Sequence, residues 1–132
     1  MTDLIVFPDA VALVASHLAD VLAVPVVHDV PNPRPASFVT VRRGGGVRHT
    51  VVTDKPQLLF ECWADRAEDA IDLAQLARAY VNALPGQVLA GVPVYRVEEL
   101  GGPSELPDPL SQQPRVVFTS LVHVRGTTAV GS

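Results

Sequence analysis

Alternation of hydrophobic and polar residues is strongest in the middle of the chain. Ser37–Arg43 alternates with a period of two, and two further β-rich runs follow, Val47–Val52 and Gln57–Ala64. Gly44 to Gly46 separate the first two runs, and Asp54-Lys55-Pro56 separates the last two. Glycine and proline at such positions are typical of tight turns between antiparallel strands. The pattern therefore predicts a β-meander of three strands.

Two other segments have the apolar spacing of amphipathic helices. The first covers residues 9–22, with Pro8 and Asp9 at its start. The second covers residues 65–84 and ends before Pro85-Gly86. Asp65 with Glu68 fits a capping box, in which an N-cap acceptor is followed three residues later by an acid. The apolar stripes of the two predicted helices are Val11, Val14, Leu18 and Leu22, and Ala70, Leu73, Ala74, Ala77, Val81 and Leu84.

The remaining segments complete an α+β pattern. Val24–Val27 fits a short edge strand, whereas Val92–Glu99 and Arg115–Arg125 fit two further long strands. Gly101–Pro114 contains four prolines and reads as a long loop. We expect a mostly antiparallel sheet, made of the meander and the two further long strands and packed against two α-helices. The expected organisation is a single domain over residues 1–125 and a flexible C-terminal tail over residues 126–132.

Both helices are expected to cover the same face of the sheet. Leu59 and Trp63 would then lie on the opposite face, which is too apolar to face bulk water. Packing against another protein chain is the expected explanation.

The composition argues against a nucleic-acid-binding or membrane-spanning protein. The chain has 132 residues, of which 48% are hydrophobic and 18% charged, and a net charge of −4. This charge argues against general nucleic-acid binding, which needs a basic surface. No apolar run approaches the ~18 residues of a membrane span, and Asp3 and Asp9 interrupt any signal-peptide pattern. The lone Cys62 excludes an intramolecular disulfide.

The sequence carries no pattern typical of a catalytic or metal-binding site. The four histidines are scattered, and none has a partner at ligand spacing on a shared face. Cys62 alternates with Leu58 and Phe60, which predicts a buried hydrophobe rather than a nucleophile. Glu98 and Glu99 are adjacent on a strand and point to opposite faces, so they cannot act as an acid pair. We expect no enzyme, no catalytic residues, no metal and no cofactor.

Arg42, Arg43 and Arg48 flank the predicted glycine turn. They are either solvated charges or contacts to an acidic neighbour, such as the acid-rich start of the second helix in another copy. Phosphate binding ranks third, because little else in the chain is basic.

The order of short motifs extends this picture. Five motifs precede an alanine-rich helix: Pro31-Asn32-Pro33-Arg34-Pro35, Phe38-Val39, Val41-Arg42-Arg43-Gly44-Gly45, Asp54-Lys55-Pro56 and Glu61-Cys62-Trp63-Ala64. Gly102-Pro103, Leu106-Pro107-Asp108-Pro109, Pro114-Arg115 and Phe118-Thr119 follow it. In this order, over nearly the whole chain, they resemble the tail terminator (tail-completion) proteins of bacteriophages with long, non-contractile tails.

The resemblance implies a structural protein of the virion, assembled in the host cytoplasm, with an α+β fold. Members of this family form a homohexameric ring on the head-proximal end of the tail tube. The ring stops polymerisation of the tail-tube protein and offers the surface that joins the head connector. DNA would pass through the lumen without specific binding, and no membrane is involved.

The expected subunit or partner contacts follow from sequence features rather than from family motifs. They are Arg34, Arg42, Arg43, Gly44, Gly45, Gly46, Arg48, Leu106, Pro107, Asp108 and Arg115. Another neck component (a head-closure or adaptor protein) is the nearest alternative. A small-molecule-binding domain that uses the apolar sheet face as a pocket is a more distant one.

Overall fold

The computed structural model describes residues 4–129, which form two helices and eight strands. The helices are α1 (Ala10–Val21) and α2 (Ala67–Asn82). The strands are β1 (Leu4–Val6), β2 (Val26–Val27), β3 (Phe38–Arg48), β4 (Thr53–Trp63), β5 (Val88–Leu89), β6 (Val92–Glu105), β7 (Arg115–Arg125) and β8 (Thr127–Ala129).

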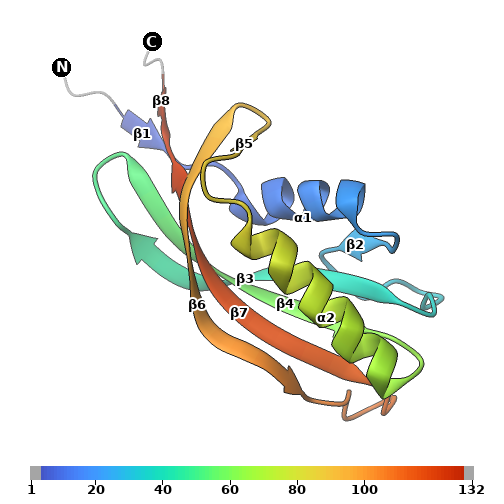
Figure 1. Ribbon diagram of the computed structural model, residues 1–132. Coiled ribbons are helices and arrows are strands. Elements are labelled where there is room, and N and C mark those ends of the chain that lie inside the picture. Colours follow the sequence, from blue (N-terminus) through green and yellow to red (C-terminus); the bar gives the residue numbers. More distant parts are fainter. Residues whose placement is uncertain (1–3, 130–132) are drawn as a thin grey trace.

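Six strands form one strongly curled sheet, in the order β2-β3-β4-β7-β6-β5. All neighbours in this sheet are antiparallel except β2 and β3. β1 and β8 form a separate antiparallel ribbon. The predicted α+β class, with two helices and a mostly antiparallel sheet, is confirmed (Figure 1).

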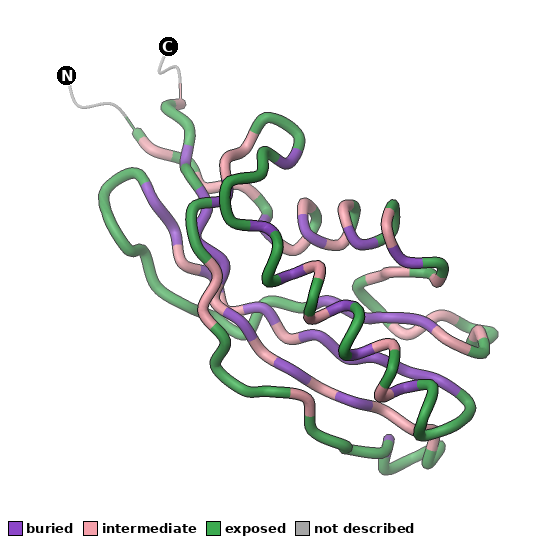
Figure 2. Tube along the Cα trace, in the orientation of Figure 1, coloured by how far each residue is buried: buried purple, intermediate pink, exposed green. Residues whose placement is uncertain are grey.

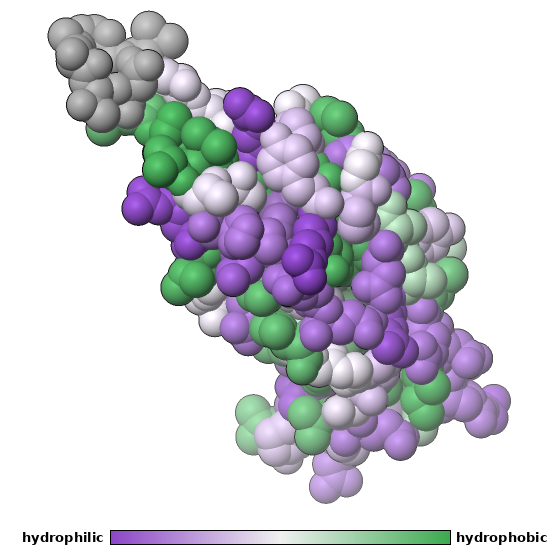
Figure 3. Space-filling model, turned by 60° about the vertical axis from the view of Figure 1, so that its left-hand side comes forward, coloured by the Kyte–Doolittle hydropathy of each residue, from purple (hydrophilic) through white to green (hydrophobic). Residues whose placement is uncertain are grey.

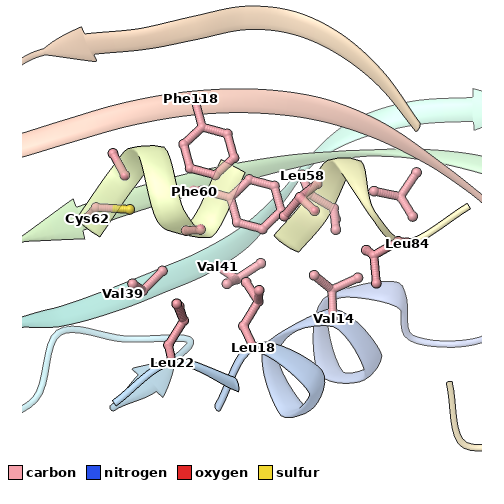
Figure 4. Packing of buried hydrophobic residues seen from close by; sticks show 14 of the residues in the cluster. Val14, Leu18, Leu22, Val39, Val41, Leu58, Phe60, Cys62, Leu84 and Phe118 are labelled. Atoms are coloured by element: carbon pink, nitrogen blue, oxygen red, sulfur yellow. The ribbon is translucent and has the colours of Figure 1, made fainter. Parts of the chain in front are cut away.

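Both helices lie on one side of the sheet, and the core fills the space between (Figure 1). Val14, Leu18 and Leu22 of the α1 segment point toward the sheet residues Val39 and Val41 (Figure 4). On the central strands, the rings of Phe60 and Phe118 stack with their centroids 4.6 Å apart. The fully buried alanines of α2 are Ala70, Ala74 and Ala77. Their small side chains let the helix backbone lie close to β4 and β7, as predicted.

The two helix starts differ from each other. Asp9 caps α1, because its carboxylate accepts a hydrogen bond from the backbone N–H of Ala12 at 3.1 Å. The predicted capping box of Asp65 and Glu68 is wrong. The N-cap residue of α2 is Arg66, which makes no side-chain capping hydrogen bond, and its guanidinium pairs with Glu68 instead.

The predicted glycine turn is also wrong. β3 continues through Gly44, Gly45 and Gly46 to Arg48, and the pairing register with β4 shifts between Arg43 and Gly46. Gly45 and Gly46 have φ angles of 94° and 90°, so the glycines form a bulge within the strand rather than a reversal. The chain reverses at residues 49–52, and the three-stranded meander is a two-stranded hairpin of β3 and β4.

The end of the chain is more ordered than the pattern predicted. The expected loop over residues 101–114 begins as the last part of β6, which leaves residues 106–114 between β6 and β7. β7 has the predicted bounds. In the expected tail, Thr127–Ala129 pair with Leu4–Val6, whereas residues 130–132 lie outside the described part of the chain. Strands of three residues carry too little alternation to be recognised.

Gly46→Ala should destabilise the fold more than Gly45→Ala. A Cβ at Gly46 would collide with the Lys55 carbonyl oxygen and lie 2.6 Å from the Gln57 nitrogen, whereas a Cβ at Gly45 meets nothing within 4 Å. Positive φ alone costs about 1–2 kcal/mol in both variants, and the collision should add about 1–3 kcal/mol at Gly46. Urea unfolding of both variants measures the difference. Equal losses would contradict the bulge geometry.

Candidate assembly surface

The residues predicted to contact partners fall into two groups at opposite ends of β3. Arg42 to Gly46 and Arg48 lie along its second half. The other group is Arg34, Leu106, Pro107, Asp108 and Arg115. It gathers beyond the start of β3, where Phe38 pairs with Trp63 and Trp63 with Arg115.

Trp63 is the centre of this second group. It lies on the sheet face opposite the helices, because it alternates with the core residue Cys62. Its ring stacks on Phe38 with a centroid distance of 5.3 Å, and its indole N–H donates to Thr40 Oγ1 at 3.3 Å. Only 3% of Trp63 is exposed. The expectation that Trp63 is covered by another chain is therefore wrong.

Arg115 and Glu61 form a largely buried ion pair beside Trp63. Arg115 Nη1 lies 3.0 Å from Glu61 Oε2, while Glu61 Oε1 accepts from the Thr40 hydroxyl at 3.0 Å. Arg115 Nε donates to the Leu106 carbonyl oxygen at 2.8 Å, and its guanidinium lies 5.2 Å from the Trp63 ring centroid. The pair thus fastens the start of the 106–114 loop to the sheet.

Arg34 holds the rest of this loop. Its Nη1 lies 3.5 Å from Asp108 Oδ2, 3.3 Å from Ser111 Oγ and 3.2 Å from Gln113 Oε1. Its guanidinium is the second to lie over Trp63, at 5.3 Å. The Ser111 hydroxyl donates to Asp108, which together with nearby backbone N–H groups and Arg34 lowers the pKa of that carboxyl. Arg34 and Arg115 were predicted as anchors for a partner, and in this structure their donors bind the chain's own loop.

The second half of β3 is open to solvent. Every residue from Arg42 to Arg48 is exposed, as the tube in Figure 2 shows for this strand. Arg42 Nε donates to the His28 carbonyl oxygen at 3.3 Å, and Arg43 Nη2 lies 3.1 Å from Asp54 Oδ2. The Arg43 side chain remains 41% exposed. The guanidinium groups on the second half of β3 are therefore more accessible to solvent than that of Arg115.

Exposed apolar side chains accompany this open strand. Val47 and Val51 are 65% and 67% exposed, and Leu4 and Val6 of β1 are 68% and 54% exposed. Figure 3 shows hydrophobic side chains gathered beside the two chain ends, where β1 and β8 lie. The exposed apolar residues thus include those of the β3–β4 hairpin end and the terminal ribbon, and also Leu106 and Leu110 in the 106–114 loop beside Trp63, which are 50% and 93% exposed.

Two histidines meet although the sequence pattern separated them. The His49 and His123 rings lie 5.0 Å apart, and His123 Nε2 is 2.7 Å from Glu98 Oε2. The hydrogen bond from His123 is the main cause that lowers the pKa of Glu98. The expectation that no histidine shares a face with another histidine or a carboxylate is wrong, because the hairpin turn returns His49 to β7. Among residues 4–129, no three His, Cys, Asp or Glu side chains are placed to hold a metal ion.

Cys62 is buried in the core as predicted, and burial, followed by the charge of Glu61, raises the pKa of its thiol to about 12. A groove of about 450 Å³ lies elsewhere, between α1 and the β5 turn. It is lined by Leu13, Ser16, His17 and Asp20 on α1 and by Val88 to Ala90. The sheet face expected to form a pocket in the small-molecule alternative does not contribute to it.

No protein-family model matches the chain, and no curated protein matches it significantly. None of the helices in the described range is both long and apolar enough to cross a membrane.

Glu61→Gln should destabilise the fold by about 1–3 kcal/mol, because the amide leaves Arg115 without its carboxylate in a site that water barely reaches. The Glu61 and Arg115 side chains are 11% and 20% exposed. Glu68→Gln is the matched control, since the Glu68–Arg66 pair is 63% and 72% exposed and should cost less than about 1 kcal/mol. Thermal unfolding of both variants gives the comparison. Equal small losses would show that the cluster does not hold the loop.

Proposed function

We propose that this protein is a ring-forming tail terminator of a long-tailed bacteriophage. It would cap the head-proximal end of the tail tube, stop addition of the tail-tube protein and present the surface that joins the head connector. The observation that carries the proposal is the ordered series of motifs from Pro31 to Thr119, which resembles that family over nearly the whole chain.

Features of the structure that support this proposal are surfaces to which a neighbouring subunit could bind. The sheet has two edges that no other described strand covers, one along the second half of β3 and one along most of β6. Exposed apolar residues lie close to the β3 opening, at Val47 and Val51. A subunit with two different open edges can take one neighbour on each, and such head-to-tail contacts form a ring when the rotation closes.

The proposed mechanism is geometric. One face of a homohexameric ring would copy the interface of a tail-tube layer, and the other face would offer no site for a further tube subunit. With a net charge of −4, the subunit is suited to a lumen through which DNA slides without specific binding. Another neck component, such as a head-closure or adaptor protein, would share the same subunit design.

Arg43→Glu should weaken ring formation and leave the subunit folded. Arg43 is partly exposed on the open edge, so the change leaves the apolar core intact, but it also removes the ion pair with the buried Asp54, and thermal unfolding must show that the variant stays folded. Light scattering over a dilution series should show a shift to smaller particles, with unchanged circular dichroism. Arg66→Glu changes the net charge equally at the N-cap of α2, which belongs to neither open edge, and should leave the particle mass unaltered. Intact rings for Arg43→Glu would remove this strand from the interface.

The terminator function itself is tested on polymerising tail-tube protein from the same genome. The purified protein should stop tube elongation when added at the start, which electron microscopy would record as short tubes with one capped end. Unaltered tube lengths, together with binding to the connector, would favour the head-closure alternative.

A further inference from the structure

We propose that neighbouring copies join edge to edge, with β6 of one copy pairing antiparallel to the second half of β3 in the next. This inference deepens the proposed function, and it rests on the proposed ring because only a head-to-tail arrangement uses both edges of every copy.

Both edges are open over the same part of the sheet. β2 covers β3 only at Val39 and Thr40, and β5 covers β6 only at Val92 and Pro93. Beyond these short strands, no described residue pairs with the outer side of residues 42–48 or 96–105. An uncovered edge presents a row of backbone N–H and C=O groups that another strand can use.

The strand directions favour head-to-tail pairing. The four long strands β3, β4, β7 and β6 alternate in direction, so the two outer ones run antiparallel to each other. When a rotation about an axis along the strands places the next copy, its β3 lies antiparallel to β6. The joined sheets then continue the alternation without a break.

Residues that pair with one another across β3, β4, β7 and β6 form a row that runs from one edge of the sheet to the other. One such row ends in opposite charges at the two edges. Arg43 pairs with Leu58, Leu58 with Ser120, and Ser120 with Glu99, so Arg43 and Glu99 are the two ends of one row. Both belong to the helix side of the sheet, since Leu58 is in the core and Glu99 binds Arg78 and Asn82 of α2. A neighbour joined without a shift along the strands therefore sets its Arg43 beside Glu99.

This contact extends a chain of alternating charges. Arg43 already pairs with Asp54 at 3.1 Å, and Arg78 reaches Glu99 at 2.5 and 2.9 Å. Hydrogen bonds from Arg78 and Asn82 lower the pKa of Glu99 to about 2, so the carboxylate is charged at neutral pH. Across the junction the order becomes Asp54, Arg43, Glu99, Arg78, and every adjacent pair is attractive.

Twofold pairing of identical edges is disfavoured by the same charges. Two β3 edges would bring Arg42, Arg43 and Arg48 against themselves. Two β6 edges would bring together Glu98, Glu99 and Glu105, with only Arg96 of opposite sign on the same strand. Like charges placed opposite each other destabilise a strand pair, so the edges fit each other better than they fit their own copies.

The test mixes two proteins, Arg43→Cys and Glu99→Cys, under mild oxidation. Directly opposed residues on antiparallel strands have Cα atoms about 4.5–5.5 Å apart, within disulfide range. Within one chain the same two positions are three strand spacings apart, about 14 Å, so no intramolecular bond forms. Buried Cys62, with its raised pKa, stays unreactive.

The mixture should give roughly tenfold more Arg43→Cys/Glu99→Cys heterodimer than either protein gives homodimer. Arg42→Cys with Gly101→Cys, from the next row, is a second pair that leaves the Glu99 network intact, and a Cβ at Gly101 meets nothing within 4 Å. Arg66→Cys mixed with Glu99→Cys is the negative control.

Homodimers of Arg43→Cys, or absence of heterodimer for both rows at about millimolar protein, would overturn the pairing. The crosslinking result and the tube-elongation result can be interpreted independently of each other. Crosslinked rings that do not stop tube growth would uphold the pairing and reject the terminator function. Capped tubes without crosslinks would uphold the function and place the ring contacts elsewhere.

Discussion

The pairing of β4 with β7 is the constraint on which the rest of the structure depends. The paired residues Phe60 and Phe118 are 58 residues apart in sequence, and both strands have partners along their other sides. Their stacked phenylalanines and the alternating apolar residues around them form the floor on which both helices pack (Figure 4). Such a long-range contact cannot form until much of the chain is ordered, so the helices gain little stability before the central strands meet.

The side chains of Arg34 and Arg115, with the 106–114 loop, shield the apolar sheet face around Trp63 from water. A sheet covered by helices on one side leaves its other side to water, and here that side carries Phe38 and Trp63. Two guanidinium groups cover the indole ring while each also binds the 106–114 loop. Arginine suits this role, because its planar group stacks on an aromatic ring and still donates several hydrogen bonds at its edge. No described side-chain nitrogen or oxygen that is buried lacks a partner, so this apolar face is closed without leaving a buried charge unpaired.

Local pattern predicted the elements well and their connections poorly. β7 alternates over its whole length, and the stripe of α1 ends in a defined cap, so both were found within a residue or two. The prediction of a turn at Gly44 to Gly46 is wrong because a turn and a bulge both favour glycine at positive φ. Only the pairing of residues 46–48 with 54–56 distinguishes the two, and no local pattern contains that information. Coverage of Trp63 and the meeting of His49 with His123 depend in the same way on residues far away in sequence.

Open strand edges require protection against indiscriminate pairing, and both edges here have it. The glycine bulge interrupts β3, and register shifts on either side of Gly101, together with Pro103, interrupt β6. Charges line the uninterrupted parts, positive on β3 and mainly negative on β6. These features oppose pairing with an arbitrary strand, yet they are complementary to each other. An edge that repels its own copy and attracts the opposite edge allows growth in one direction around a ring. The features that restrict aggregation would then also select the neighbour.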